Sequence, residues 1–136
     1  MIKPIMKSEF FLRLPSEDAG PDDAATGQDL LDTLHEHEHD CVGLAANMIG
    51  VRKRIICVKD GNRALLMYNP QILEQVNAYQ TSEGCLSLAG ERPCTRYRRI
   101  KVEYLDENFV HRIKNFSGYT AEIIQHEIDH CCGIVI

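Results

Sequence analysis

Residues 125–130 constrain this chain more than any other stretch of its sequence. They read Gln-His-Glu-Ile-Asp-His, so His126 and His130 are four residues apart. On an α-helix this spacing puts two side chains on one face, about 5–6 Å apart at their Cβ atoms. Two imidazoles placed in this way can bind one metal ion, and Glu127 beside them can carry a proton. The alternative is a solvated helix face, but the isoleucines around the motif favour a helix that packs against the body of the protein.

Two histidines leave a catalytic metal ion short of one protein ligand, because such sites use three ligands and keep a fourth position open. The sequence predicts Cys85 as the third ligand, since Gly84 before it allows a close approach of the backbone. Cys41, Cys94 and Cys57 are weaker candidates, because a single cysteine is ordinarily a small buried hydrophobic residue. A thiolate and two imidazoles suit zinc or ferrous iron, and the ligand types do not choose between them.

The order of the expected elements predicts a single catalytic domain over residues 1–136 with an α+β fold. Antiparallel or mixed β-sheets are expected around a central C-terminal helix that binds the metal, with a second helix near the N-terminus, because hairpins dominate and β-α-β alternation is absent. Residues 1–15 are expected to form a short strand or arm. The expected helices run from about 22 to 39 and from 118 to 133, and the expected strands cover 54–59, 64–68, 72–79, 99–105 and 109–116.

Two short stretches suggest sites by their composition. Residues 42–50 are small and apolar with glycines at both ends, which predicts either a buried turn or a site wall whose backbone can pair with a peptide. Residues 35–40 alternate between histidine and acidic side chains, but a period of two spreads these side chains around a helix. We therefore interpret the second stretch as a solvated helix end.

The charge and composition exclude several classes of partner. The net charge is −5 and the pI about 5.6, so the chain has no excess of basic residues for binding nucleic acid. No apolar run approaches the roughly 18 residues that a membrane span needs. The first residues lack the apolar core and cleavage site of a signal peptide, which predicts a cytoplasmic protein with reduced cysteines.

Three segments together resemble the peptide deformylase family. They are residues 43–50 (Gly-Leu-Ala-Ala-Asn-Met-Ile-Gly), residues 83–87 (Glu-Gly-Cys-Leu-Ser) and residues 125–130, followed by Gly133. The histidine motif alone is weak evidence, whereas its combination with the cysteine motif in this order is specific. The resemblance implies a metal-dependent hydrolase that removes the N-formyl group from formylmethionyl peptides and nascent proteins and releases formate.

The resemblance also implies roles for individual residues. Cys85, His126 and His130 match the metal ligands of the family, and Glu127 matches its general acid/base. The backbone N–H of Leu86 would meet the formyl oxygen. The implied cofactor is one divalent metal ion, Fe²⁺ in the cell, with Zn²⁺, Ni²⁺ or Co²⁺ as replacements in purified protein.

Other matching positions imply contacts with the substrate or with the ligands. Val42 and Gly43 fall where the family pairs with the substrate backbone, and Arg92 falls where an arginine reaches the substrate. Glu83 and Gln125 would support the metal ligands from behind. Nascent chains are the implied partners, with a contact at the ribosome. The arginine partner of Glu83 is open among three candidates, Arg98 being favoured over Arg96 and Arg99.

The sequence departs from the family pattern at a catalytic position. Met48 stands where the family has a glutamine whose amide donates to the oxyanion, and a thioether donates nothing. Loss of such a donor costs about 10²–10³ in rate. Asn47 could replace it only by turning inward. This departure leaves two alternatives, a related hydrolase with a different acylated-amine substrate and a catalytically impaired homologue that binds metal or peptide.

Glu122 is a second departure that bears on the substrate. It lies one helical turn before His126, in a region that borders the methionine pocket in the family. An inward carboxylate would disfavour an apolar side chain there, so we expect Glu122 to face water.

Overall fold

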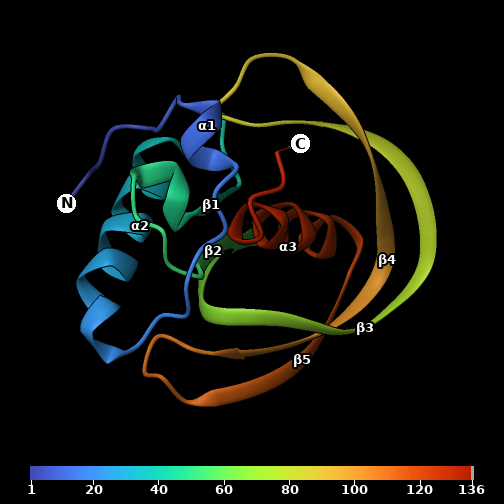
Figure 1. Cartoon of the computed structure of the whole chain (residues 1–136). Helices are drawn as coiled ribbons and strands as arrows, with labels where there is room; N and C mark the ends of the chain where they lie inside the picture. Colours follow the sequence, from blue (N-terminus) through green and yellow to red (C-terminus); the bar gives the residue numbers. More distant parts are fainter. Residues whose placement is uncertain (136) are drawn as a thin grey trace.

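The computed structural model describes residues 1–135 and confirms the predicted α+β fold. Helix α3 (Gly118–Cys131) lies in the middle, and the strands of one antiparallel sheet curve around it (Figure 1). The sheet has five strands in the order β1-β2-β3-β4-β5, so each strand pairs with its neighbours in sequence. The elements are α1 (Glu9–Leu12), the 3₁₀ helix η1 (Pro21–Asp23), α2 (Ala24–Glu36), β1 (Gly43–Ala45), the 3₁₀ helix η2 (Ala46–Ile49), β2 (Ile55–Asp60), β3 (Arg63–Gly84), β4 (Glu91–Leu105), β5 (His111–Ser117) and α3.

Strands β3 and β4 are much longer than the sequence predicts. The expectation that Asn69-Pro70 ends a strand is wrong, because β3 runs through both residues to Gly84. Proline cannot donate to the ladder, and the sheet accommodates Pro70 with a register shift between Tyr68 and Gln71. The length of this hairpin lets it bend around α3, as Figure 1 shows.

The N-terminal segment also differs from the expectation. Residues 9–12 form the short helix α1 and not a strand, and α2 ends at Glu36, before the expected position 39. Ser16 donates a backbone hydrogen bond to Cys131 at the end of α3. Gly133 has φ +76°, and a Cβ there would lie 2.4 Å from the carbonyl oxygen of Arg13, so only glycine allows the two chain ends to meet.

The core lies between α2, β2 and α3. Residues 55–58 of β2 are completely buried, Leu30 and Leu34 of α2 cover one side of them, and Ile124 of α3 belongs to the same cluster. Helix α3 is buried on most of its circumference because the sheet surrounds it, so its polar side chains must find partners inside the protein. None of the helices formed by residues 1–135 combines the length and the apolar character that crossing a membrane requires.

Candidate active site

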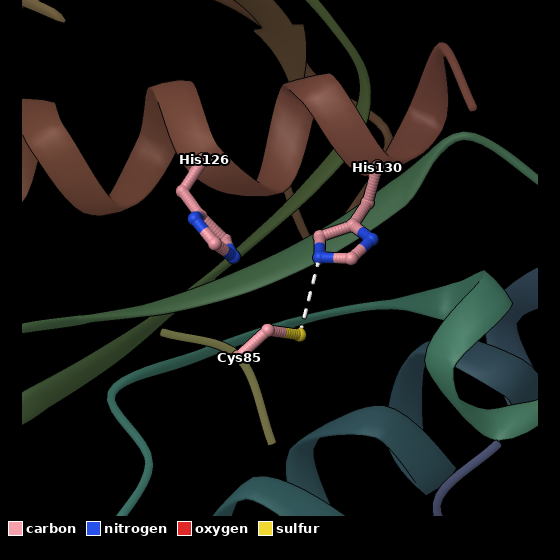
Figure 2. A group of neighbouring side chains, drawn as sticks. All are labelled: Cys85, His126 and His130. Atoms are coloured by element: carbon pink, nitrogen blue, oxygen red, sulfur yellow. Dashed lines mark hydrogen bonds between the residues drawn. The ribbon is translucent and has the colours of Figure 1, made fainter. Parts of the chain in front are cut away.

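Three side chains from two distant parts of the chain converge on one point. His126 and His130 project from α3 toward Cys85, which lies in the loop after β3 (Figure 2). One ligand atom from each residue lies within 4.8 Å of the others, and Cys85 Sγ is 3.4 Å from His130 Nε2. Two ligands of a tetrahedral zinc ion, one sulfur and one nitrogen, are roughly 3.6 Å apart. The geometry of the three residues therefore fits one metal ion.

The remaining cysteine candidates do not join this group. Cys57 is buried in β2, and Cys94 lies on β4. Cys41 lines the same cavity as Cys85 and His126, but its thiol donates to the carbonyl of Gly43, and burial raises its pKa to about 12. Among the cysteines of residues 1–135, the structure thus brings Cys85, which the sequence favoured, to His126 and His130.

A buried ionic network holds His126 in place. Glu83 Oε1 lies 2.8 Å from His126 Nδ1, which leaves Nε2 as the nitrogen that faces the metal position. Arg96 donates from Nε and Nη2 to the same carboxylate and from Nη1 to Asp129. Burial alone raises the pKa of Glu83, but hydrogen bonds from His126 and Arg96 outweigh it and hold the pKa well below its usual range. Carboxylate support of a histidine ligand fixes the orientation of its ring.

The partner of Glu83 is Arg96 and not Arg98, which the sequence favoured. Both arginines lie at alternate positions of β4, so the strand period does not distinguish them. The register places Glu83 opposite Arg92, four residues from Arg96, which is about 13 Å along a flat strand. Curvature of the hairpin around α3 closes this gap on the inner face. Arg98 is exposed and stacks over the ring of Tyr79 instead.

The charges around the two histidines shift their pKa values in opposite directions. Burial lowers the pKa of His126, but hydrogen bonds with Cys85 and Glu83 outweigh it and raise the pKa to about 10. Burial and the positive charges of His126 and Arg96 lower the pKa of His130 to about 3. His130 is therefore neutral at pH 7, as a metal ligand must be, and an ion that bound here would displace the proton of His126.

Glu127 is placed to carry a proton. Its side chain lines the cavity, is 4% exposed, and has one oxygen without a hydrogen-bond partner among residues 1–135. Burial raises its pKa to about 7, with His126 acting in the opposite direction. A carboxyl group with this pKa can both accept and return a proton near neutral pH. A Cβ at Gly43 would lie 3.0 Å from Glu127 Oε2 and 2.7 Å from Ile123, so glycine is what lets β1 approach the helix.

The cavity in front of the ligands has a volume of about 360 Å³, and the edge strand β1 borders it. The carbonyl of Val42 accepts from Lys59 of β2, so the alternation of the ladder turns the amide groups of Gly43 toward the open edge. Val42 and Gly43 both line the cavity. An extended peptide could therefore pair with β1 as an additional strand.

Neither Met48 nor Asn47 supplies the side-chain amide that donates to the oxyanion in the family pattern. Met48 lines the cavity, is buried, and accepts the Ala45 N–H at its sulfur, 3.4 Å away. The alternative that Asn47 turns inward to replace the amide is wrong, because its side chain donates to the carbonyl of His130. The backbone N–H of Leu86 lies on the cavity-lining loop, and no residue in the described part of the chain accepts from it.

Two expected site residues lie away from the cavity. Gln125 bonds to both backbone groups of Tyr97 and thereby ties α3 to β4, without a contact to the metal ligands. Arg92 does not line the cavity, and its Nη2 lies 4.0 Å from Glu9 of α1. No sequence pattern indicated Lys7, whose ammonium group donates to the carbonyl of Leu86 at 2.7 Å.

Glu122 does not simply face water, contrary to our expectation. It is partly buried, lines the cavity, and accepts a hydrogen bond of 3.1 Å from the hydroxyl of Tyr79. Burial and the neighbouring carboxylate of Glu83 raise its pKa above the usual value. Tyr79 lies on β3, and the curvature of the sheet around α3 brings it to the helix.

Comparison with known proteins places the chain in one family. A family model for polypeptide deformylases matches residues 6–136. The peptide deformylase of Clostridium beijerinckii is 52% identical over 136 residues, which is all of both chains. Peptide deformylase 1 of Clostridium perfringens is 38% identical over 111 residues, a match that covers 79% of this chain and 74% of the relative.

Solved structures agree with these sequence matches. The peptide deformylase of Thermotoga maritima superimposes with a TM-score of 0.89 at 28% identity, covering 99% of this chain and 95% of the other. A class I type b peptide deformylase of Acinetobacter baumannii, with Met-Ala-Ser bound, has a TM-score of 0.87 at 28% identity, covering 99% and 96%. The chain therefore belongs to the peptide deformylase family, a family of metal-dependent hydrolases.

Proposed function

We propose that this protein removes the formyl group from N-formylmethionyl peptides at the cavity in front of Cys85, His126 and His130. The observation that carries the proposal is the convergence of these three ligand atoms beside the buried carboxyl group of Glu127. The Acinetobacter deformylase of the same fold holds a peptide that begins with methionine, which supports this class of substrate.

In this proposal, each residue around the cavity has its own role in the reaction. A bound divalent ion would supply Lewis-acid activation of water at neutral pH. Glu127 takes the proton from that water and returns it to the departing amine. The Leu86 N–H donates to the formyl oxygen as it gains charge. The open edge of β1 at Gly43 holds the peptide, while Glu83 keeps His126 oriented.

Met48 gives the reaction one donor fewer than the family pattern. We propose that Leu86 is the main donor to the oxyanion and that the chemical step is correspondingly slow. The two alternatives, a different acylated amine and an inactive binding protein, are not favoured. The convergence of three candidate ligand atoms and the position of Glu127 on the cavity wall support hydrolysis of a formyl group instead. Arg92 would have to leave Glu9 to contact a longer substrate, and that contact stays a prediction.

We further propose Fe²⁺ as the ion in the cell. One sulfur and two nitrogen ligands suit ferrous iron as well as zinc. Metal analysis of protein purified without oxygen should find iron in proportion to formate release, and activity that follows zinc alone would contradict this assignment. Because nascent chains carry the formyl group, we also propose a cytoplasmic enzyme that meets its substrate at the ribosome, with residues 1–136 as one catalytic domain.

The decisive experiment measures formate release from formyl-Met-Ala-Ser by protein loaded anaerobically with Fe²⁺, Ni²⁺ or Co²⁺. Wild-type protein should release formate, Cys85→Ala should lose both metal and activity, and Glu127→Gln should keep the metal while turnover falls. The matched control is Cys94→Ala, which removes a thiol outside the ligand group and should change neither quantity. Formate release by none of the metal forms would defeat the proposal.

A further inference from the structure

Glu122 lies on the wall of the cavity in which the proposed reaction takes place. Tyr119, Glu122, Ile123 and His126 all line the cavity, and their spacing puts them along one face of α3. Glu122 precedes His126 by one turn, which is about 5.4 Å along the axis. A substrate whose formyl group lies at His126 would therefore extend its first side chain along Glu122 and its neighbours.

The charges around the cavity make this wall an acceptor surface. The carboxylates of Asp40, Glu91 and Glu122 line the cavity, and no lysine or arginine among residues 1–135 does so. Glu83, which also lines it, is neutralised from behind by Arg96. Asp40 and Glu91 are exposed, whereas Glu122 is partly buried, so its carboxyl group interacts most strongly with a bound side chain.

The hydrogen bonding of Glu122 fixes its direction without exhausting its capacity. The Tyr79 hydroxyl donates to Oε1, which holds the side chain against the wall. A carboxyl group has about four acceptor sites, so a bound ligand can still donate to it. An apolar side chain would cover these sites without pairing them, and covering an unpaired polar group is unfavourable.

We propose that Glu122 selects the first side chain of the formylated substrate and extends the substrate class to side chains that donate a hydrogen bond, such as glutamine and lysine. This inference rests on the proposed deformylase activity and concerns the same cavity. Glutamine and methionine have similar lengths, so the difference between them at this wall is chiefly the presence of a donor. Lysine adds a positive charge to the donor.

The test compares formyl-Met-Ala-Ser, formyl-Gln-Ala-Ser and formyl-Lys-Ala-Ser as substrates of one metal-loaded preparation. Ratios of kcat/KM within one preparation do not depend on how much of the protein is active. In Glu122→Ile, the Gln:Met and Lys:Met ratios should both fall by at least about fivefold, the lower end of the effect of one unpaired hydrogen-bonding group. In Glu122→Gln, the Gln:Met ratio should persist because the amide still accepts, while the Lys:Met ratio should fall.

Glu91→Gln is the matched control, because it neutralises another carboxylate that lines the same cavity. It should leave the Gln:Met ratio unchanged and move the Lys:Met ratio less than Glu122→Gln does. The inference would be overturned if both ratios in Glu122→Ile stayed within about twofold of wild type, or if Glu91→Gln changed the Lys:Met ratio as much as Glu122→Gln does. Either result would leave the deformylase activity itself untouched. A wild-type protein without turnover of formyl-Met-Ala-Ser would instead defeat the deformylase activity itself, and this inference with it.

Discussion

Replacing Arg96 by methionine should destabilise the protein by about 3–5 kcal/mol, the cost of removing one partner from a buried ion pair. The Arg96 side chain is 5% exposed and the Glu83 side chain 8%, so water does not compensate for the lost contact. Methionine fills much of the volume but leaves the Glu83 carboxylate with His126 as its remaining charged partner. Asp129 loses its contact at the same time.

This loss can be read as a shift of the melting temperature. An unfolding entropy of roughly 2.1 cal/mol/K per residue amounts to about 0.29 kcal/mol/K for 136 residues. The expected decrease of Tm is therefore about 10–17 °C. Circular dichroism of chelator-treated protein measures it without a contribution from metal binding.

The control is Arg112→Met, which breaks the ion pair between Arg112 and Asp106. Arg112 lies on the outer strand β5, and its side chain is 49% exposed. Surface pairs contribute at most about 1 kcal/mol, so Tm should fall by no more than about 3 °C. If Arg96→Met lowers Tm no further than this control, the buried network does not hold the site together.

Three further predictions concern the chemistry of the cavity. Met48→Gln should raise kcat up to about 10²-fold by adding an oxyanion donor, and an unchanged rate of formate release would count against that role. Glu127 has a pKa of about 7 when folded and 4.5 as a free side chain, so the unfolded state binds fewer protons between these values, and stability falls as pH rises through them. In metal-free Glu127→Gln, the free energy of unfolding measured in urea should not show this decrease with pH. The same pH dependence in both proteins would refute the prediction. Lys7→Met frees the carbonyl of Leu86, so the metal should be lost faster to a chelator, with Lys7→Arg restoring wild-type retention.

Much of the centre could be predicted because its residues are close in sequence. His126, Glu127 and His130 lie within five residues of one helix, so helical geometry alone sets their relation. Cys85 stands 41 residues earlier, and its motif, not its spacing from the histidines, indicated it. The structure brings all three ligands together, and their roles in catalysis stay predictions until the variants are measured.

The residues that the sequence did not assign correctly depend on long-range curvature. Arg96 and Arg98 have the same phase in β4, and the register and the bend of the β3–β4 hairpin together decide which one reaches Glu83. The same bend brings Tyr79 to Glu122. Lys7 reaches Leu86 across 79 positions of sequence, a contact that no local pattern records.

The sequence by itself determined the α+β fold, the two long helices and the set of candidate ligands, because helical spacing and short motifs are local properties. Only the tertiary structure decided the partner of Glu83, the inward position of Glu122 and the loss of Asn47 as a donor. The physical reason is that a strand period tells which face a side chain occupies, whereas the pairing register and the curvature of the sheet determine which side chains on that face meet.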